Sequence, residues 1–171
     1  MVVIGVVVAT IQINLFSDNA RRLRDEGERL AALLTALADE SVTSGQPLAV
    51  SFSENGYTFW ERNPEATALQ ATAPQSAQNA SPRWRERPND ELFSSRTLQG
   101  EIRIAEVRIR QRPLSLSNSR ADENLARIAF SPSGIHPPFS VLLSLDDLRV
   151  QVIADAVGNL RVVDDLDEGL F

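Results

Sequence analysis

The chain has no cysteine and no lysine, and it contains a single histidine. Without cysteine there is no disulfide framework, no thiol nucleophile and no thiolate metal site. One histidine cannot build a multi-histidine metal centre, and Gly-rich phosphate loops are absent, so the sequence predicts neither a bound metal nor a cofactor. All 17 basic residues are arginine and stand against 23 acids, and the net charge of −6 argues against bulk binding of nucleic acid.

Long apolar runs are also scarce, and the clearest one stands at the start of the chain. Residues 1–11 (MVVIGVVVATI) are almost wholly apolar, but a membrane-spanning helix needs about 20 apolar residues. A signal peptide would need a basic segment before its apolar run. A buried core helix is the alternative, but because this run has no polar face, we interpret it as the distal half of a membrane segment. Three arginines follow this run: Arg21, Arg22 and Arg24. By the positive-inside rule alone, they would place the part of the chain after the membrane segment in the cytoplasm.

Residues 17–45 have the pattern of an amphipathic helix that continues this run. Its apolar stripe is formed by leucines at three-, four- and seven-residue spacings: Leu23, Leu30, Leu34 and Leu37. The pattern assigns Glu26 to the opposite, polar face, and Gly45 before Gln46-Pro47 predicts the helix end. We expect residues 1–16 to be the distal part of a membrane or filament helix, and the four leucines to hold residues 17–45 to the body.

From residue 46 to residue 171 the pattern changes to short strands separated by turns. Asn55-Gly56 predicts a hairpin turn, because both residues tolerate positive φ. In residues 101–112 the alternation changes phase, which predicts a β-bulge at Ala105-Glu106. Residues 63–82, rich in Ala, Gln, Pro and Ser, predict a mobile surface loop. One long helix before short strands predicts an α+β fold, with the N-terminal helix packed on an antiparallel β-sheet or β-sandwich.

Two further segments complete the expected β domain. Residues 139–145 and 148–154 predict a second hairpin across Asp146-Asp147. Between the mobile loop and the bulged strand, the apolar side chains expected to anchor the chain are Trp84, Leu92, Phe93 and Leu98.

No catalytic constellation stands out in the sequence. His136 lies in Gly-Ile-His-Pro-Pro, and the sequence contains no Gly-x-Ser-x-Gly nucleophile elbow whose serine could pair with it. We interpret it as a turn residue, and the alternative is the general base of a membrane-anchored periplasmic hydrolase. The acidic tail from Asp164 to Glu168 lacks the spacing of a calcium loop and predicts a solvated terminus.

Arginine is concentrated in residues 83–112, where eight arginines stand against five acids, whereas residues 140–171 have two arginines and seven acids. The alternation directs four of the eight outward from the bulged strand: Arg103, Arg108, Arg110 and Arg112. This patch suits an acidic docking partner or a phosphate backbone. A solvated strand face is the third interpretation.

Several segments, taken in this order, resemble the GspH family of minor pseudopilins of bacterial type II secretion systems. They are 2–9 (VVIGVVVA), 29–34 (RLAALL), 39–41 (DES), 44–47 (SGQP), 55–59 (NGYTF), Trp84, 90–92 (DEL), 96–98 (RTL), 128–134 (IAFSPSG), 138–139 (PF) and 155–158 (DAVG). The family's basic leader and its Gly-Phe-Thr-Leu-x-Glu peptidase site have no counterpart here. We interpret this as an N-terminal truncation or a misassigned start.

The resemblance implies a type IV pilin-like fold and a structural subunit without enzymatic activity, cofactor or small-molecule substrate. It implies a single-pass anchor in the bacterial inner membrane and a C-terminal domain in the periplasm. The subunit would join other minor pseudopilins and the major pseudopilin near the tip of the pseudopilus. Helix packing in the filament would use Val2, Ile4, Val7 and Ile11. The alternative is a minor pilin of a type IV pilus whose arginine patch binds DNA.

Overall fold

A computed structural model describes residues 3–63, 84–87, 91–116 and 126–164, with the backbone alone for residues 3–17. It contains one long helix, α1 (Val3–Ser44), in front of short strands. The strands are β1 (Leu48–Ser53), β2 (Gly56–Arg62), β3 (Trp84–Glu86), β4 (Arg96–Thr97), β5 (Arg103–Ile109), β6 (Arg112–Pro113), β7 (Arg127–Phe130), β8 (Phe139–Leu145), β9 (Leu148–Ala154) and β10 (Leu160–Asp164). Gly45 follows α1 with a φ of 68°, which confirms the predicted helix end.

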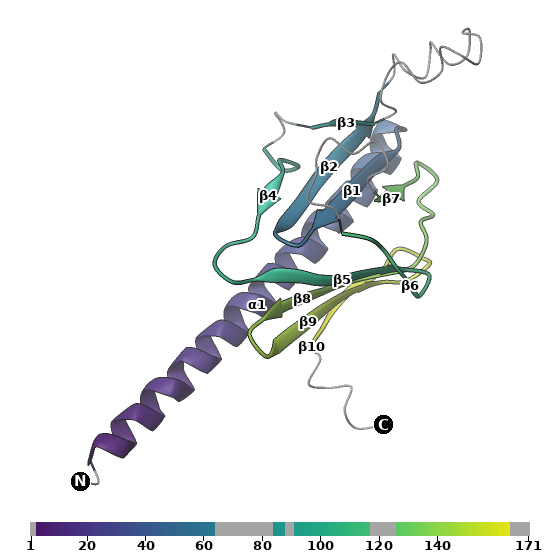
Figure 1. The fold of residues 1–171 in the computed structure, drawn as a ribbon. Helices are drawn as coiled ribbons and strands as arrows, with labels where there is room; N and C mark the ends of the chain where they lie inside the picture. Colours follow the sequence, from purple (N-terminus) through teal and green to yellow (C-terminus); the bar gives the residue numbers. More distant parts are fainter. Residues whose placement is uncertain (1–2, 64–83, 88–90, 117–125, 165–171) are drawn as a thin grey trace, which may run out of the picture.

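The strands form two antiparallel sheets that pack against the C-terminal half of α1 (Figure 1). We call them sheet A, with the order β3-β2-β1-β7 and β4 paired to β2, and sheet B, with the order β10-β9-β8-β5-β6. The N-terminal half of α1 projects away from both sheets (Figure 1). The α+β fold, with a long N-terminal helix on antiparallel sheets, is confirmed.

Close packing of α1 on sheet B depends on a residue without a side chain. A Cβ atom at Gly27 would lie 2.9 Å from Cγ1 of Val150 and 3.4 Å from Cγ1 of Val162. Contacts shorter than about 3.0 Å are not tolerated between carbon atoms in a close-packed interior. Gly27 therefore sets how near the helix lies to β9 and β10.

The first hairpin forms as predicted, but Gly56, which was expected in the Glu54-Asn55-Gly56 turn, belongs to β2. Ser53 pairs with Gly56, so the turn residues are Glu54 and Asn55, and neither Asn55 nor Gly56 has a positive φ. Gly56 opens β2 and meets another constraint, since a Cβ there would lie 2.0 Å from the carbonyl oxygen of Arg96 in β4. Glycine is therefore needed at position 56 because β4 packs closely against it, and not because the turn requires a positive φ.

Sheet B confirms two predictions and corrects one. The register between β5 and β8 shifts between Ile104 and Glu106, which is the predicted bulge, and β8 and β9 form the predicted hairpin. The strand β5 ends earlier than expected, however. Arg110 and Gln111 have φ of 50° and 66° and form a two-residue turn into β6, a geometry typical of type I′ hairpins.

Of the predicted anchors in the segment after the mobile loop, Phe93 and Leu98 are buried. Leu92 is 53% exposed, so the prediction for Leu92 was wrong. Leu92 and Phe93 are adjacent, and only Phe93 stacks on a core ring, with its centroid 5.4 Å from that of Phe59. The predicted loop 63–82, apart from Asn63, lies outside the described residues, as do Arg83 and the acidic tail beyond Asp164.

Candidate assembly surface

The four stripe leucines lie where α1 meets the two sheets. Leu23, Leu30, Leu34 and Leu37 are fully buried and belong to one apolar cluster that includes side chains from both sheets. Burying a leucine side chain contributes roughly 1.5–3 kcal/mol relative to leaving it exposed. The C-terminal half of the helix is thus a rigid part of the body.

The predicted filament-packing residues lie on the projecting half of α1. The backbone at Ile4, Val7 and Ile11 is helical, and Val2 lies outside the described residues. Among the parts of the chain that the structure describes, no helix is long and apolar enough to cross a membrane.

Glu26 does not lie on a polar face as predicted, because it is buried and forms an ion pair with sheet A. Nε and Nη2 of Arg96 donate to its two carboxylate oxygens over 3.0 and 3.1 Å, and the hydroxyl of Tyr57 donates to Oε1 over 3.4 Å. Position 26 lies three residues after Leu23 and four before Leu30, within the stripe itself. The spacing of Glu26 therefore indicated a buried position, but the prediction assigned it to the polar face because glutamate is charged.

This cluster also changes the acidity of Tyr57. Burial raises the pKa of the Tyr57 phenol, and the negative charge of Glu26 raises it further, while Arg96 lowers it by a smaller amount. The phenol is consequently held in its neutral, donating form. We call Glu26, Tyr57 and Arg96 the polar clamp.

Three described arginines of the segment before β5, Arg85, Arg87 and Arg96, pair with carboxylates of the body. Nε of Arg85 donates to a carboxylate oxygen of Glu61 in β2 over 2.7 Å. Arg87 lies 3.7 Å from the other oxygen of Glu61 and stacks on the ring of Phe93, with 5.1 Å from Cζ to the ring centroid. Together with Arg96 in the polar clamp, they fasten the β3–β5 connection to the body.

The four predicted patch residues are all exposed, but the structure brings together only three of them. Arg108 near the end of β5, Arg110 in the turn and Arg112 in β6 share one hairpin, which we call the basic hairpin. Arg103 lies at the other end of β5, opposite Ser144. Nε of Arg108 lies 2.9 Å from Glu106, and this hydrogen bond raises the pKa of the Arg108 guanidinium. No carboxylate within the described residues pairs with Arg110 or Arg112.

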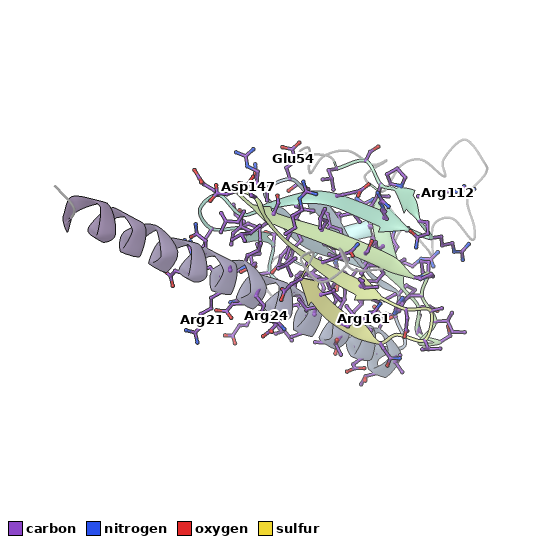
Figure 2. All side chains as sticks on the ribbon, turned by 90° about the horizontal axis from the view of Figure 1, so that it is seen from below. Arg21, Arg24, Glu54, Arg112, Asp147 and Arg161 are labelled. Atoms are coloured by element: carbon purple, nitrogen blue, oxygen red, sulfur yellow. The ribbon has the colours of Figure 1, made fainter. Side chains whose placement is uncertain are left out.

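Charges of opposite sign lie towards the two ends of the body. Figure 2 shows Glu54, in the β1–β2 turn, and Asp147, in the β8–β9 turn, at the end from which the free half of α1 projects. Arg112 of the basic hairpin lies at the opposite end in this view. The two acidic turns and the basic hairpin therefore lie at different ends of the body, and charged surfaces of this kind can orient a docking partner.

His136 is buried among aromatic rings and is only 4% exposed. Its ring lies 5.2 Å from that of Phe130 and 5.6 Å from that of Phe139, measured between centroids. No hydroxyl donates to Nε2, which has no hydrogen-bond partner among the described atoms, so the structure shows no pair of nucleophile and base. Within the described ranges, no group of three metal-ligating side chains is found either.

Comparison with known proteins agrees with this architecture. A family model described as "Type II transport protein GspH" matches residues 26–158, which confirms the resemblance noted in the sequence. A crystal structure of the minor pseudopilin EpsH from the type II secretion system of Vibrio cholerae is similar, with a TM-score of 0.60 and 17% identity over 84% of this chain and 94% of that one. The solution structure of Escherichia coli GspH has a TM-score of 0.58 and 18% identity, over 88% and 93%. No curated protein matches this sequence.

Proposed function

Because this chain belongs to the GspH family of type II transport proteins, we propose that it is a minor pseudopilin that assembles near the tip of the type II secretion pseudopilus and supports protein export across the outer membrane. Its neighbours in this proposal are other minor pseudopilins and the major pseudopilin. Its role is structural and not enzymatic, and it uses no cofactor, metal or small-molecule substrate.

One observation carries this proposal beyond the family match: the same helix is half embedded and half free. Leucines of the C-terminal half are fully buried in the body, while the N-terminal half projects with no sheet beside it (Figure 1). An isolated apolar helix segment in water is unfavourable, so the free half requires lipid or other helices around it. We propose that it lies in the inner membrane before assembly and packs on neighbouring helices in the filament, through Val2, Ile4, Val7 and Ile11, with the β domain in the periplasm.

The charge distribution supports docking between subunits. Arg110 and Arg112 extend from a tight turn, and no described carboxylate neutralises them. Exposed charges of this kind contribute little to folding stability, but they steer and orient association. The basic hairpin is therefore the surface that we expect to meet an acidic neighbour, and the acidic turns are the surface that meets a basic one.

Charge reversal at the basic hairpin tests the proposal. The full chain, tagged and produced in its own host with the other secretion subunits, is purified in detergent, and co-purified pseudopilins are quantified. We expect the unaltered chain to retain pseudopilins and the R110E/R112E variant to lose at least five-fold of them, with reduced export. Arg161→Glu is the matched control, because Arg161 is exposed on β10 away from the hairpin (Figure 2).

The alternative function is that of a minor pilin that binds DNA through the same hairpin. Unpaired guanidinium groups also suit phosphate, and such binding weakens steeply with salt. If the unaltered chain captures no pseudopilin but retards DNA, and R110E/R112E abolishes this retardation, the pilus alternative replaces the secretion role.

A further inference from the structure

A pocket of about 150 Å³ lies at the C-terminal end of α1, far from the projecting half of the helix. Its walls come from three places: Ala38, Asp39 and Val42 on the helix, the segment that follows β7, and the β9–β10 turn at Val157-Gly158. We call it the distal pocket. It is separate from the basic hairpin and from the polar clamp.

The edge of the distal pocket is apolar and exposed. Val42 is 50% exposed and Val157 is 78% exposed. Val157 is not on a loose loop, because the carboxylate of Asp155 accepts the backbone N–H groups of Val157 over 2.9 Å and of Asn159 over 3.0 Å. The side-chain amide of Asn159 donates to the same carboxylate over 3.0 Å and is the main reason that the pKa of Asp155 is lowered, and the backbone N–H groups lower this pKa further. A pre-organised apolar rim of this kind is typical of a surface that binds a partner.

Two polar side chains of the pocket, Asp39 and His136, have atoms without a hydrogen-bond partner among the described residues. Nδ1 of His136 lies 3.1 Å from the carbonyl oxygen of Pro137, and since a carbonyl only accepts, Nδ1 carries the proton. The other ring nitrogen, Nε2, is buried and has no hydrogen-bond partner among the described residues. Asp39 has no partner among the described residues, and the hydroxyl of Ser131 already lies 2.8 Å from that of Ser133.

The helix itself adds negative character to the same place. The carbonyl end of an α-helix carries a partial negative charge, which a basic side chain in the last turn normally offsets. The last turn of α1 contains no basic residue. Asp39 and Glu40 instead add two acids close to this end.

We propose that the distal pocket receives a lysine or arginine side chain from the neighbouring pseudopilin that stacks on this end of the subunit. The aliphatic stem would lie between Val42 and Val157, as long basic side chains do along apolar surface. The charged head would pair with Asp39 in a charge-assisted hydrogen bond, beside Nε2 of His136 and the helix terminus. A purely apolar anchor would leave these polar groups unpaired, which costs free energy on burial. This inference rests on the proposed function, because it names the partner as a subunit of the same filament.

The composition of the chain permits a direct test, since it contains no native cysteine. Val157→Cys in the full chain, labelled in host membranes with a maleimide–benzophenone photo-crosslinker, reports only what lies against the rim. We expect a crosslink to one pseudopilin, and the crosslinked peptide, identified by mass spectrometry, should contain a lysine or arginine. Asp39→Asn should lower the yield at least five-fold, and Asp39→Glu should preserve it.

Glu40→Gln is the matched control, because Glu40 is the next carboxylate of the helix and does not line the pocket. Equal losses for Asp39→Asn and Glu40→Gln would overturn the specific pairing. So would a crosslinked peptide without a basic residue, or no crosslink from Val157→Cys while pseudopilins still co-purify with the chain. If no pseudopilin associates with the chain in either experiment, the proposed function fails and not the pocket alone.

Discussion

Two adjacent residues of α1 hold the two sheets by different physical means. Gly27 faces sheet B, where a Cβ would lie 2.9 Å from Val150, so this contact depends on the absence of a side chain. Glu26 faces sheet A, where its carboxylate pairs with Arg96 and Tyr57. One peptide step along the helix therefore separates a close apolar contact from a buried ion pair.

The comparison shows how a single helix can organise two sheets that share few contacts with each other. Close apolar packing is non-directional and tolerates no added volume. A buried ion pair is directional and fails when either partner is removed, because the remaining charge is left in a poorly solvated site. At sheet B the helix position thus depends on close apolar packing at Gly27, and at sheet A it depends on the ion pair of Glu26. Added volume should therefore destabilise the first contact, and loss of a charged partner the second.

The largest effect is expected at the close contact. Gly27→Leu gains about 1 kcal/mol of helix propensity but forces a side chain into Val150 and Val162, so we expect a net loss of about 3 kcal/mol in the free energy of unfolding. Urea denaturation followed by tryptophan fluorescence measures it. Thr35→Leu, at an exposed position of the same helix, should change stability by less than about 0.5 kcal/mol. An unchanged midpoint in Gly27→Leu would show that helix and sheet B can separate without cost.

The polar clamp should give a smaller loss that depends on pairing. Arg96→Met leaves the carboxylate of Glu26 buried without its cation. A fully buried pair loses about 3–5 kcal/mol when broken, but the Arg96 side chain is 25% exposed, so we expect about 2 kcal/mol. The double variant Glu26→Gln with Arg96→Met should recover more than half of this loss.

The control for this pair is Arg85→Met, which breaks the more exposed ion pair with Glu61 and should cost less than about 1 kcal/mol. If the losses from Glu26→Gln and Arg96→Met simply add, the two residues do not act as a unit, and the distinction between the sheets is not one of chemistry.

Sequence periodicity was sufficient for the features that follow from local backbone rules. The helix end at Gly45, the bulge after Ile104 and the β8–β9 hairpin each arise from a pattern within a few residues, and all are confirmed. The burial of Glu26 was missed because residue type was given more weight than its place in the stripe. Its partner Arg96 lies 70 positions away in the sequence, and no local rule joins the two.

Prediction of the surface failed where a turn had to be placed. The alternation in residues 101–112 counted Arg110 and Arg112 as strand residues, although the chain reverses at Arg110-Gln111. Non-glycine residues with positive φ are uncommon, so composition gave no warning of this turn. The distal pocket could not be found either, because its walls come from α1, the segment after β7 and the β9–β10 turn. Long-range packing alone brings these three together.

The smallest effect concerns Tyr57, the single tyrosine of the chain, whose absorbance therefore reports one site. Burial, and then the charge of Glu26, raise its pKa in the folded protein above the ordinary value of about 10. A raised pKa means that the neutral phenol contributes stability fully below about pH 10 and loses this contribution as the pH rises further. We expect the phenolate absorbance to appear only together with alkaline unfolding, and not at about pH 10. Tyr57→Phe should cost about 1 kcal/mol or less at neutral pH.

Removing either charge of the polar clamp tests what raises the pKa of Tyr57. Arg96 lowers the pKa of Tyr57, whereas Glu26 raises it, so Glu26→Gln should move phenol ionisation to lower pH, and Arg96→Met should not. Both variants lose one member of the same clamp, and only the sign of the removed charge differs. A shift in the same direction for both would indicate loosened packing around the ring, and sheet A would then be held to the helix by shape, as sheet B is.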